Sequence, residues 1–444
     1  MKTNRWILIV VIVAAVLILG LCTLTVVGGY TYIRRNQAVS GMFTNLDNSA
    51  QVSDEHTMEV DDGTGLVMDV SAGDIYVTTG AEGVMEFEMN RTAWGENADE
   101  AAAVAEALNV DFSEHAGDVQ VTFRRTQDEM LFGKRNDVDR IDFTVRVPAG
   151  TDLELTTNYG TIYLQDVSGE VVLDAAFGEV QVEGLQGELQ IKNQNGHVRL
   201  QDVDAGSGEI SVMSNFGGID VENLEAGTAH LETQNGGMTL KGIQTIGKIE
   251  LSSLFGDIEL TDFSGADLVA ESDNGGITLV DGELSGKLKA GSFFQDIVIQ
   301  DVSAENYTAN SNNGAISLQG ASGRLQLGTS FGDIEVSDAQ DAILQVRVEN
   351  GSIRFSGSLA VDEEHSLEGS FGDIDLTIPE DSSFDVVLET EFGSIRSDMP
   401  LTLQGEFSQE HMSGSMNAGG PLLHIKTSNG NISITAQKVY NEGE

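Results

Sequence analysis

The chain has 444 residues, of which 51 are glycine and only 4 are proline, and its formal net charge is −48. Four of its 23 lysines and arginines, but none of its 71 acidic residues, lie before residue 36, so the remainder is more acidic still. A body of this charge repels nucleic acids and anionic lipid surfaces, and we expect no nucleic-acid partner. Cys22 is the only cysteine, which excludes disulfides within the chain.

The sequence begins with a long apolar segment, "WILIVVIVAAVLILGLCTLTVVG" at 6–28. At ~1.5 Å per residue, a helix of this length crosses a bilayer core of ~30 Å. Trp6 and Tyr30 lie where interfacial aromatic residues belong. Residues 1–35 are therefore predicted to be a cytoplasmic tail and a transmembrane signal anchor, with the body outside the membrane. A cleaved signal peptide is the alternative, but its apolar region is usually shorter.

Two regions separate this anchor from the main part of the chain. Residues 36–56 are polar and without period, and are predicted to be a linker. Residues 57–150 contain alternating apolar and polar segments typical of strands, and one helix is predicted at 97–110. Asn97 is its expected N-cap, followed by acidic residues in the first turn. We expect this region to cap one end of the domain that follows.

Residues 151–440 are built from short repeats, each with a glycine turn between two apolar–polar alternations. The turn position recurs every 18 to 21 residues, at Gly160, Gly178, Gly196, Gly217, Gly236, Gly256, Gly275, Gln295, Gly314, Gly332, Gly351, Gly372 and Gly393. Two half-buried strands cannot bury their apolar face alone, so successive units must stack. This predicts an all-β fold, a β-solenoid resembling a parallel β-helix.

The residue before the turn position alternates between asparagine and phenylalanine. Asparagine occurs at Asn195, Asn235, Asn274, Asn313 and Asn350, and phenylalanine at Phe177, Phe216, Phe255, Phe294, Phe331 and Phe371. If one coil is one unit, the two types alternate along a single row. If one coil is two units, each type stacks on itself ~4.8 Å apart in a ladder of its own. We favour the second arrangement, because stacking of like on like explains the strict alternation.

Several phenylalanine units carry an acid directly after the turn position, at Glu179, Asp257, Asp296, Asp333 and Asp373. With coils of two units these carboxylates would stack and repel one another unless a cation such as calcium lay between them. However, the Gly-Gly-x-Gly-x-Asp nonapeptide of calcium-binding β-rolls is absent. We therefore favour solvated carboxylates that accept backbone N–H bonds, and predict no cofactor.

No catalytic constellation is visible in the sequence. The seven histidines share no metal-ligand spacing, and there is no nucleophile elbow or phosphate loop. The chain is accordingly predicted not to be an enzyme. A polysaccharide-active β-helix enzyme, acting through a pair of acids on one face, is the remote alternative.

Three phrases resemble a known family: "VRVPAGTDLELTTNYGTIYLQDVSGEV", "SNNGAISLQG" and "FGDIEV". They are similar to the bacterial membrane-anchored β-strand-repeat proteins of unknown function called "putative adhesins". The resemblance implies an extracytoplasmic solenoid without catalytic residues, acting as a cell-surface binding or structural protein toward a protein or glycan ligand. An accessory role in envelope-stress sensing, through partners in the membrane, is the alternative. The first phrase is echoed by "TIPEDSSFDVVLETEFGSI" at 377–395.

Overall fold

The computed structural model describes residues 48–125, 139–404 and 408–437. The predicted anchor, residues 6–28, lies outside these ranges. Among the residues that are described, no helix is long and apolar enough to cross a membrane. The chain forms two compact units, a small one that includes Thr92–Ala107 and a large one that includes residues 140–404 and 408–437.

The small unit contains the single predicted helix, which the structure places at α2 (Ala98–Ala107). Asn97 is its N-cap as predicted, because its Oδ1 accepts a hydrogen bond from the Glu100 backbone N–H at 2.9 Å. The Glu100 carboxylate in turn accepts the Glu96 N–H at 3.1 Å, in the manner of a capping box. The helix is thereby fixed at its first turn.

The unit boundaries run through two long strands, β1 (Asn48–Glu59) and β4 (Val84–Gly95), which pair with each other. Residues 48–56 were expected to belong to a linker, and this is wrong. One face of β1 is only half-buried and includes the polar residues Asp54 and His56, so the strand shows little apolar alternation in its sequence.

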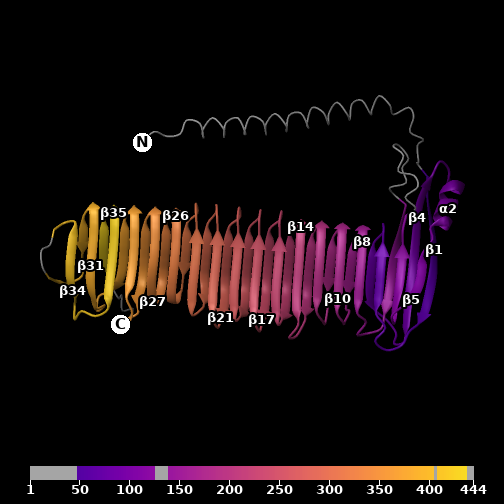
Figure 1. Ribbon diagram of the computed structural model, residues 1–444, viewed down its shortest axis with the longest axis horizontal. Helices are drawn as coiled ribbons and strands as arrows, with labels where there is room; N and C mark the ends of the chain where they lie inside the picture. Colours follow the sequence, from indigo (N-terminus) through magenta and orange to yellow (C-terminus); the bar gives the residue numbers. More distant parts are fainter. Residues whose placement is uncertain (1–47, 126–138, 405–407, 438–444) are drawn as a thin grey trace, which may run out of the picture. The chain divides into compact units, whose positions relative to one another are not determined.

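The large unit is a β-solenoid, which confirms the predicted fold class (Figure 1). Its strands alternate between two sheets, and from β10 to β25 each strand pairs with the strands two places before and after it. The first sheet contains β8 (Leu153–Tyr159), β10 (Val171–Phe177), β12 (Leu189–Asn195), β14 (Glu209–Phe216), β16 (Thr228–Thr233), β18 (Lys248–Ser253), β20 (Asp267–Ser272), β22 (Lys287–Ser292), β24 (Asn306–Ser311), β26 (Ser322–Phe331) and β29 (His365–Phe371).

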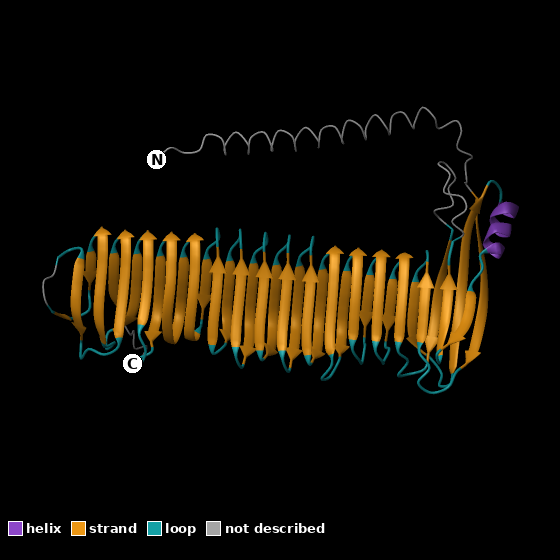
Figure 2. Cartoon of the chain, in the orientation of Figure 1, coloured by secondary structure: helices purple, strands orange, loops and turns teal. Residues whose placement is uncertain are grey.

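The second sheet faces the first (Figure 2). It contains β9 (Ile162–Gln165), β11 (Val180–Glu183), β13 (Val198–Asp204), β15 (Ile219–Ala226), β17 (Met238–Thr245), β19 (Ile258–Gly265), β21 (Ile277–Leu284), β23 (Ile297–Ser303), β25 (Ile316–Gln319), β28 (Ile353–Leu359) and β30 (Ile374–Pro379). The long strand β27 (Ile334–Asn350) pairs with β25 through its first residues and with β26 through its later ones, so it contributes to both sheets.

One coil is one repeat unit. Val171 pairs with Leu189 of the next unit, and Leu189 pairs with Ile210 of the unit after that. The two-unit coil that we favoured is therefore wrong. Two short strands and two corners already return the chain to its starting sheet, so a second unit is not needed to close the coil.

The core is a continuous stack of apolar side chains between the sheets. Alternate residues of every strand point inward, as the half-buried pattern predicts. One inward row of the first sheet consists of Leu66, Leu153, Val171, Leu189, Ile210, Ala229, Ile249, Leu268, Leu288, Tyr307, Leu325 and Leu344. Burying one leucine or isoleucine contributes ~1.5–3 kcal/mol, and this gain recurs in every coil.

At the N-terminal end the coils do not follow chain order. The strands here are β2 (Leu66–Val70), β3 (Ile75–Thr79), β5 (Asp111–His115), β6 (Asp118–Phe123) and β7 (Arg140–Val147). β2 lies between β6 and β8, and β3 lies between β7 and β9. Much of the region expected to cap the solenoid is thus solenoid itself, and β5 pairs antiparallel at its edge.

At the C-terminal end the coils likewise do not follow chain order. Its strands are β31 (Phe384–Phe392), β32 (Ile395–Ser397), β33 (Leu401–Leu403), β34 (His411–Met416), β35 (Leu422–Asn429) and β36 (Ile432–Gln437). β35 lies between β29 and β31, and β36 lies between β30 and β32, so the last coil in sequence is inserted before the last coil in space. β34 pairs antiparallel with β31 at the edge.

Candidate binding surface

All the corners that join the first sheet to the second carry the repeated turn, and their backbones stack closely. Gly196 has a φ of +151°, and a Cβ built on it would lie 1.9 Å from the Gly178 carbonyl oxygen of the preceding coil. Glycine is required here because no side chain fits between two backbones at that distance. Glycine is therefore a packing requirement of this coil, whereas Gln295 occupies the equivalent position between β22 and β23.

A row of buried hydroxyl groups lies just inside these corners. Ser311 donates to the Gln295 carbonyl oxygen of the preceding coil at 3.1 Å, and accepts the Gly314 N–H of its own turn at 2.9 Å. The same carbonyl contact is made by Thr233, Ser253, Ser272, Ser292 and Thr329. Sequence reasoning missed this row, although a serine or threonine three residues before the turn position in these units was the signal that marks it.

The predicted asparagines all lie at this corner, each with its Nδ2 on a backbone carbonyl of the preceding coil. The distance is 3.2 Å from Asn195 Nδ2 to the Ala176 oxygen and 3.0 Å from Asn313 Nδ2 to the Phe293 oxygen. Asn235, Asn274 and Asn350 make the same contact. An asparagine is thus held by backbone and does not need another asparagine beside it.

The predicted phenylalanines lie in the same row as the asparagines. Asn195 pairs with Phe177 on one side and Phe216 on the other. The alternation continues where chain order is broken, because Asn429 of the inserted coil lies between Phe371 and Phe392. We call this row the aromatic corner: Tyr159, Phe177, Asn195, Phe216, Asn235, Phe255, Asn274, Phe294, Asn313, Phe331, Asn350, Phe371, Asn429 and Phe392.

The rings of the aromatic corner are half exposed. Phe177, Phe255 and Phe331 have 48, 52 and 55 % of their surface open to solvent. With asparagines between them, neighbouring phenylalanines stand two coils apart, about 9.6 Å at a strand spacing of ~4.8 Å. Large apolar side chains in an exposed, regular row mark an interaction surface.

The acids after the turn position do not form the stacked row that a two-unit coil would give. They lie in alternate coils, and the Asp257 and Asp296 carboxylates each accept a backbone N–H of the following coil at 2.7 Å. The Ser352 N–H, more than the neighbouring Arg354, lowers the pKa of Asp333. Within residues 48–125, 139–404 and 408–437, no three histidine, cysteine or acidic side chains are placed to hold a metal ion.

The opposite corner holds an acidic row that sequence reasoning missed. Asp262, Asp281 and Asp301 follow one another in consecutive coils, with φ values of +57°, +55° and +52°. Aspartate tolerates this left-handed conformation better than most residues, and Gly242 and Gly320 occupy the equivalent positions on either side. Their role in the fold is to bend the strand at this corner.

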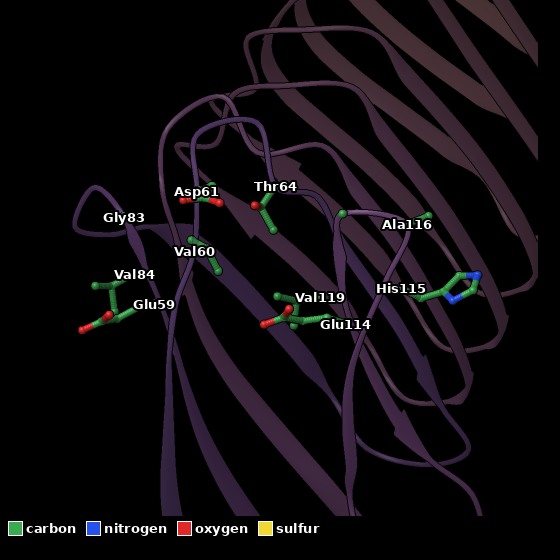
Figure 3. A pocket seen from close by; sticks show the side chains of 11 residues that line it. Glu59, Val60, Asp61, Thr64, Gly83, Val84, Glu114, His115, Ala116 and Val119 are labelled. Atoms are coloured by element: carbon green, nitrogen blue, oxygen red, sulfur yellow. The ribbon is translucent and has the colours of Figure 1, made fainter.

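A polar pocket of about 760 Å³ lies at the N-terminal end of the large unit (Figure 3). Glu59, Asp61, Glu114 and His115 are among its lining residues. The His115 ring points away from the Glu59 and Glu114 carboxylates, so no acid–base pair is formed between them (Figure 3).

Residues 295–435 match the family described as Toastrack DUF4097. This confirms the resemblance drawn from the repeat phrases, and the Toastrack match covers the C-terminal part of the solenoid. No curated protein matches the sequence.

The solved structures that the chain is similar to include three bacterial proteins. A "putative cell adhesion protein" of Clostridium sporogenes is 11 % identical, with 87 % of this chain and 100 % of that one covered, at a TM-score of 0.18. "Putative adhesins" of Bacteroides fragilis and Parabacteroides merdae are 12 and 14 % identical, each covering 64 % of this chain and 96 and 95 % of their own, at TM-scores of 0.26 and 0.27. At such scores the likeness carries no argument about function.

Proposed function

We propose that this chain is a non-enzymatic cell-surface protein that is anchored in the membrane by residues 6–28 and binds a ligand outside the cell through the aromatic corner. The observation that carries the proposal is the row of half-exposed rings, repeated through the stack at one corner. A purely structural rod would gain nothing from exposing them, since the asparagine of the neighbouring coils fits the same corner position. The apolar segment "WILIVVIVAAVLILGLCTLTVVG" supports the anchor.

The proposal is tested with the full chain expressed on a non-adherent bacterial host. Protease added to intact cells should remove the solenoid, and the cells should attach to surfaces coated with bacterial or host envelope material. A triple variant, Phe255→Asn, Phe294→Asn and Phe331→Asn, should lose attachment. Ile246→Asn, which removes a 73 % exposed apolar side chain elsewhere on the solenoid, should not.

Two results would overturn the proposal. A solenoid that protease cannot reach would contradict the location, and attachment that is equal in the triple variant would contradict the binding surface. Exchange of residues 6–28 for an unrelated transmembrane helix separates adhesion from envelope sensing. An adhesin needs only tethering, whereas a sensor acting through membrane partners needs its own helix.

A further inference from the structure

We propose that the ligand of the aromatic corner is a neutral, extended β-1,4-linked polysaccharide, with one disaccharide of the polymer spanning two coils. The inference rests on the proposed function and names its ligand class. It is carried by the spacing of the rings and by the exposure of part of each ring, together with the acidic charge of the body that surrounds them.

The spacing of the rings selects among extended polymers. Phe216, Phe255 and Phe294 occupy alternate coils, about 9.6 Å apart if neighbouring strands are ~4.8 Å apart. A β-1,4-linked glycan presents the same face of every second sugar, at a disaccharide length close to two coils. A peptide strand repeats its face every ~6.8 Å and would fall out of step with the rings. An amphipathic helix is recognised in an apolar groove, whereas these rings stand on an exposed corner.

The exposure of the rings suits the faces of sugars. Phe216 and Phe294 are 57 and 50 % exposed, so about half of each ring is available to a ligand while the other half rests on the coil. The electron-rich face of an aromatic ring attracts the positively polarised C–H groups of a pyranose. Between the rings, Asn313 commits its Nδ2 to the Phe293 carbonyl and presents its amide oxygen as an acceptor for sugar hydroxyl groups.

Both amide and acidic side chains flank the rings. The exposed residues one position before the aromatic corner include the amides Gln194, Asn215, Gln234 and Asn312, the acids Asp273, Glu349 and Glu391, and the apolar Leu254 and Phe293. A pocket of about 330 Å³ here is lined by Gln234 and Leu254 together with the acids Glu232, Glu271 and Asp273. Amides of this kind hydrogen-bond hydroxyl groups, while a body of net charge −48 disfavours an anionic polymer.

The test is affinity electrophoresis of the full chain in lipid nanodiscs, in gels that contain one polysaccharide each. Hydroxyethyl cellulose and a soluble β-1,4-mannan serve as neutral β-linked probes, with soluble starch as the neutral α-linked control and alginate as the anionic control. We expect retardation by a neutral β-linked probe and none by starch or alginate. The triple variant of Phe255, Phe294 and Phe331 to asparagine should bind roughly tenfold to a thousandfold more weakly.

A composition-matched variant tests the spacing itself. The double change Asn274→Phe and Phe294→Asn keeps the number of rings but moves one ring next to Phe255, and should bind as weakly as a variant that has lost a ring. Ile246→Asn should bind like the unchanged protein. Circular dichroism of each variant shows whether the solenoid is intact.

Several results would overturn the inference: no retardation by either β-linked probe, equal retardation by starch, or undiminished binding by the respaced variant. These failures are distinct from failure of the proposed function. If attachment of cells still depends on Phe255, Phe294 and Phe331 while no glycan binds, the aromatic corner is still the binding surface, and its ligand belongs to another class.

Discussion

A buried histidine near the C-terminal end makes the stability of the last coils sensitive to pH. His365 is 1 % exposed on the inner face of β29, beside Leu423 and edge-on to the Phe384 ring. Its Nδ1 accepts the Leu344 N–H at 3.3 Å, and its Nε2–H donates to the Ala360 carbonyl at 2.9 Å. The neutral imidazole satisfies both contacts, whereas a protonated ring could not accept the first.

Burial lowers the pKa of His365 below its usual value of 6.5, against smaller opposite effects of the Ala360 carbonyl and the Glu363 charge. Because the folded pKa is the lower one, the unfolded state binds the proton first, and stability is fully present above pH 6.5 and lost as the pH falls below it. If the folded histidine stays neutral, the loss between pH 7.5 and pH 5.5 is about 1.4 kcal/mol.

Hydrogen exchange of the amides in 365–371 measures this locally, without requiring the whole stack to unfold in one step. Unchanged protein and His365→Gln are compared at the same pH, so that intrinsic exchange rates and the titration of the many carboxylates cancel. Between pH 7.5 and 5.5 the unchanged protein should lose more local opening free energy than His365→Gln, by at most about 1.4 kcal/mol. His115→Gln, at an exposed histidine, is the matched control. Equal losses in the unchanged protein and His365→Gln would refute the reasoning.

Further predictions concern the corner. Gly196→Ala should destabilise its coil by on the order of 3 kcal/mol in urea unfolding, because the new Cβ meets the Gly178 carbonyl; a loss below ~0.5 kcal/mol would contradict the close stacking. Ser311→Ala leaves the buried Gly314 N–H without its acceptor and the Gln295 carbonyl without its donor, and should cost ~1–3 kcal/mol by the same assay, more than Ser330→Ala on the half-buried outer side. Calcium should leave the melting temperature unchanged, since Asp257 is committed to a backbone N–H; a rise in Tm of several degrees would show a cation site.

Much of the fold could be predicted because its signals are local. Alternation at Leu189, Ile191, Val198 and Leu200 specifies two half-buried strands in one unit, and short units of this kind must stack. The N-cap of α2 is likewise visible at Asn97. The asparagines and phenylalanines from Phe177 to Phe371 were noticed for the same reason, because they flank the most regular turn in the chain, whereas Tyr159, Asn429 and Phe392 of the same row were not.

The size of a coil could not be predicted from the same pattern. The 39-residue step between Phe177 and Phe216 reflects alternation along a single row, not the length of a turn of chain. What decides the question is the contact of Asn195 with the Ala176 carbonyl, which lets asparagine and phenylalanine occupy neighbouring coils without cost. Such a contact between units is invisible in a list of residues.

Local sequence signals also did not predict the insertion of coils at both ends, but two similar segments in the sequence correspond to it. After Pro148 the chain crosses the coil of β2 and β3 to enter β8, and after Pro379 it crosses the coil of β35 and β36 to enter β31. The echo between "VPAGTDLEL" and "IPEDSSFDVVL" thus marks two loops that perform the same step. Their similarity follows from the shared geometry of skipping one coil.

The central claim is that asparagine and phenylalanine form one row in consecutive coils, and a disulfide tests it most directly. In the full chain with Cys22→Ser, the pair Phe255→Cys and Asn274→Cys is one coil apart, about 4.8 Å between backbones, within the 4.4–6.8 Å that a disulfide spans. The pair Phe255→Cys and Phe294→Cys is two coils apart, about 9.6 Å, beyond that range. Mild oxidation followed by peptide mass analysis should show the 255–274 bond and not the 255–294 bond. The reverse result would mean separate ladders and would contradict the account.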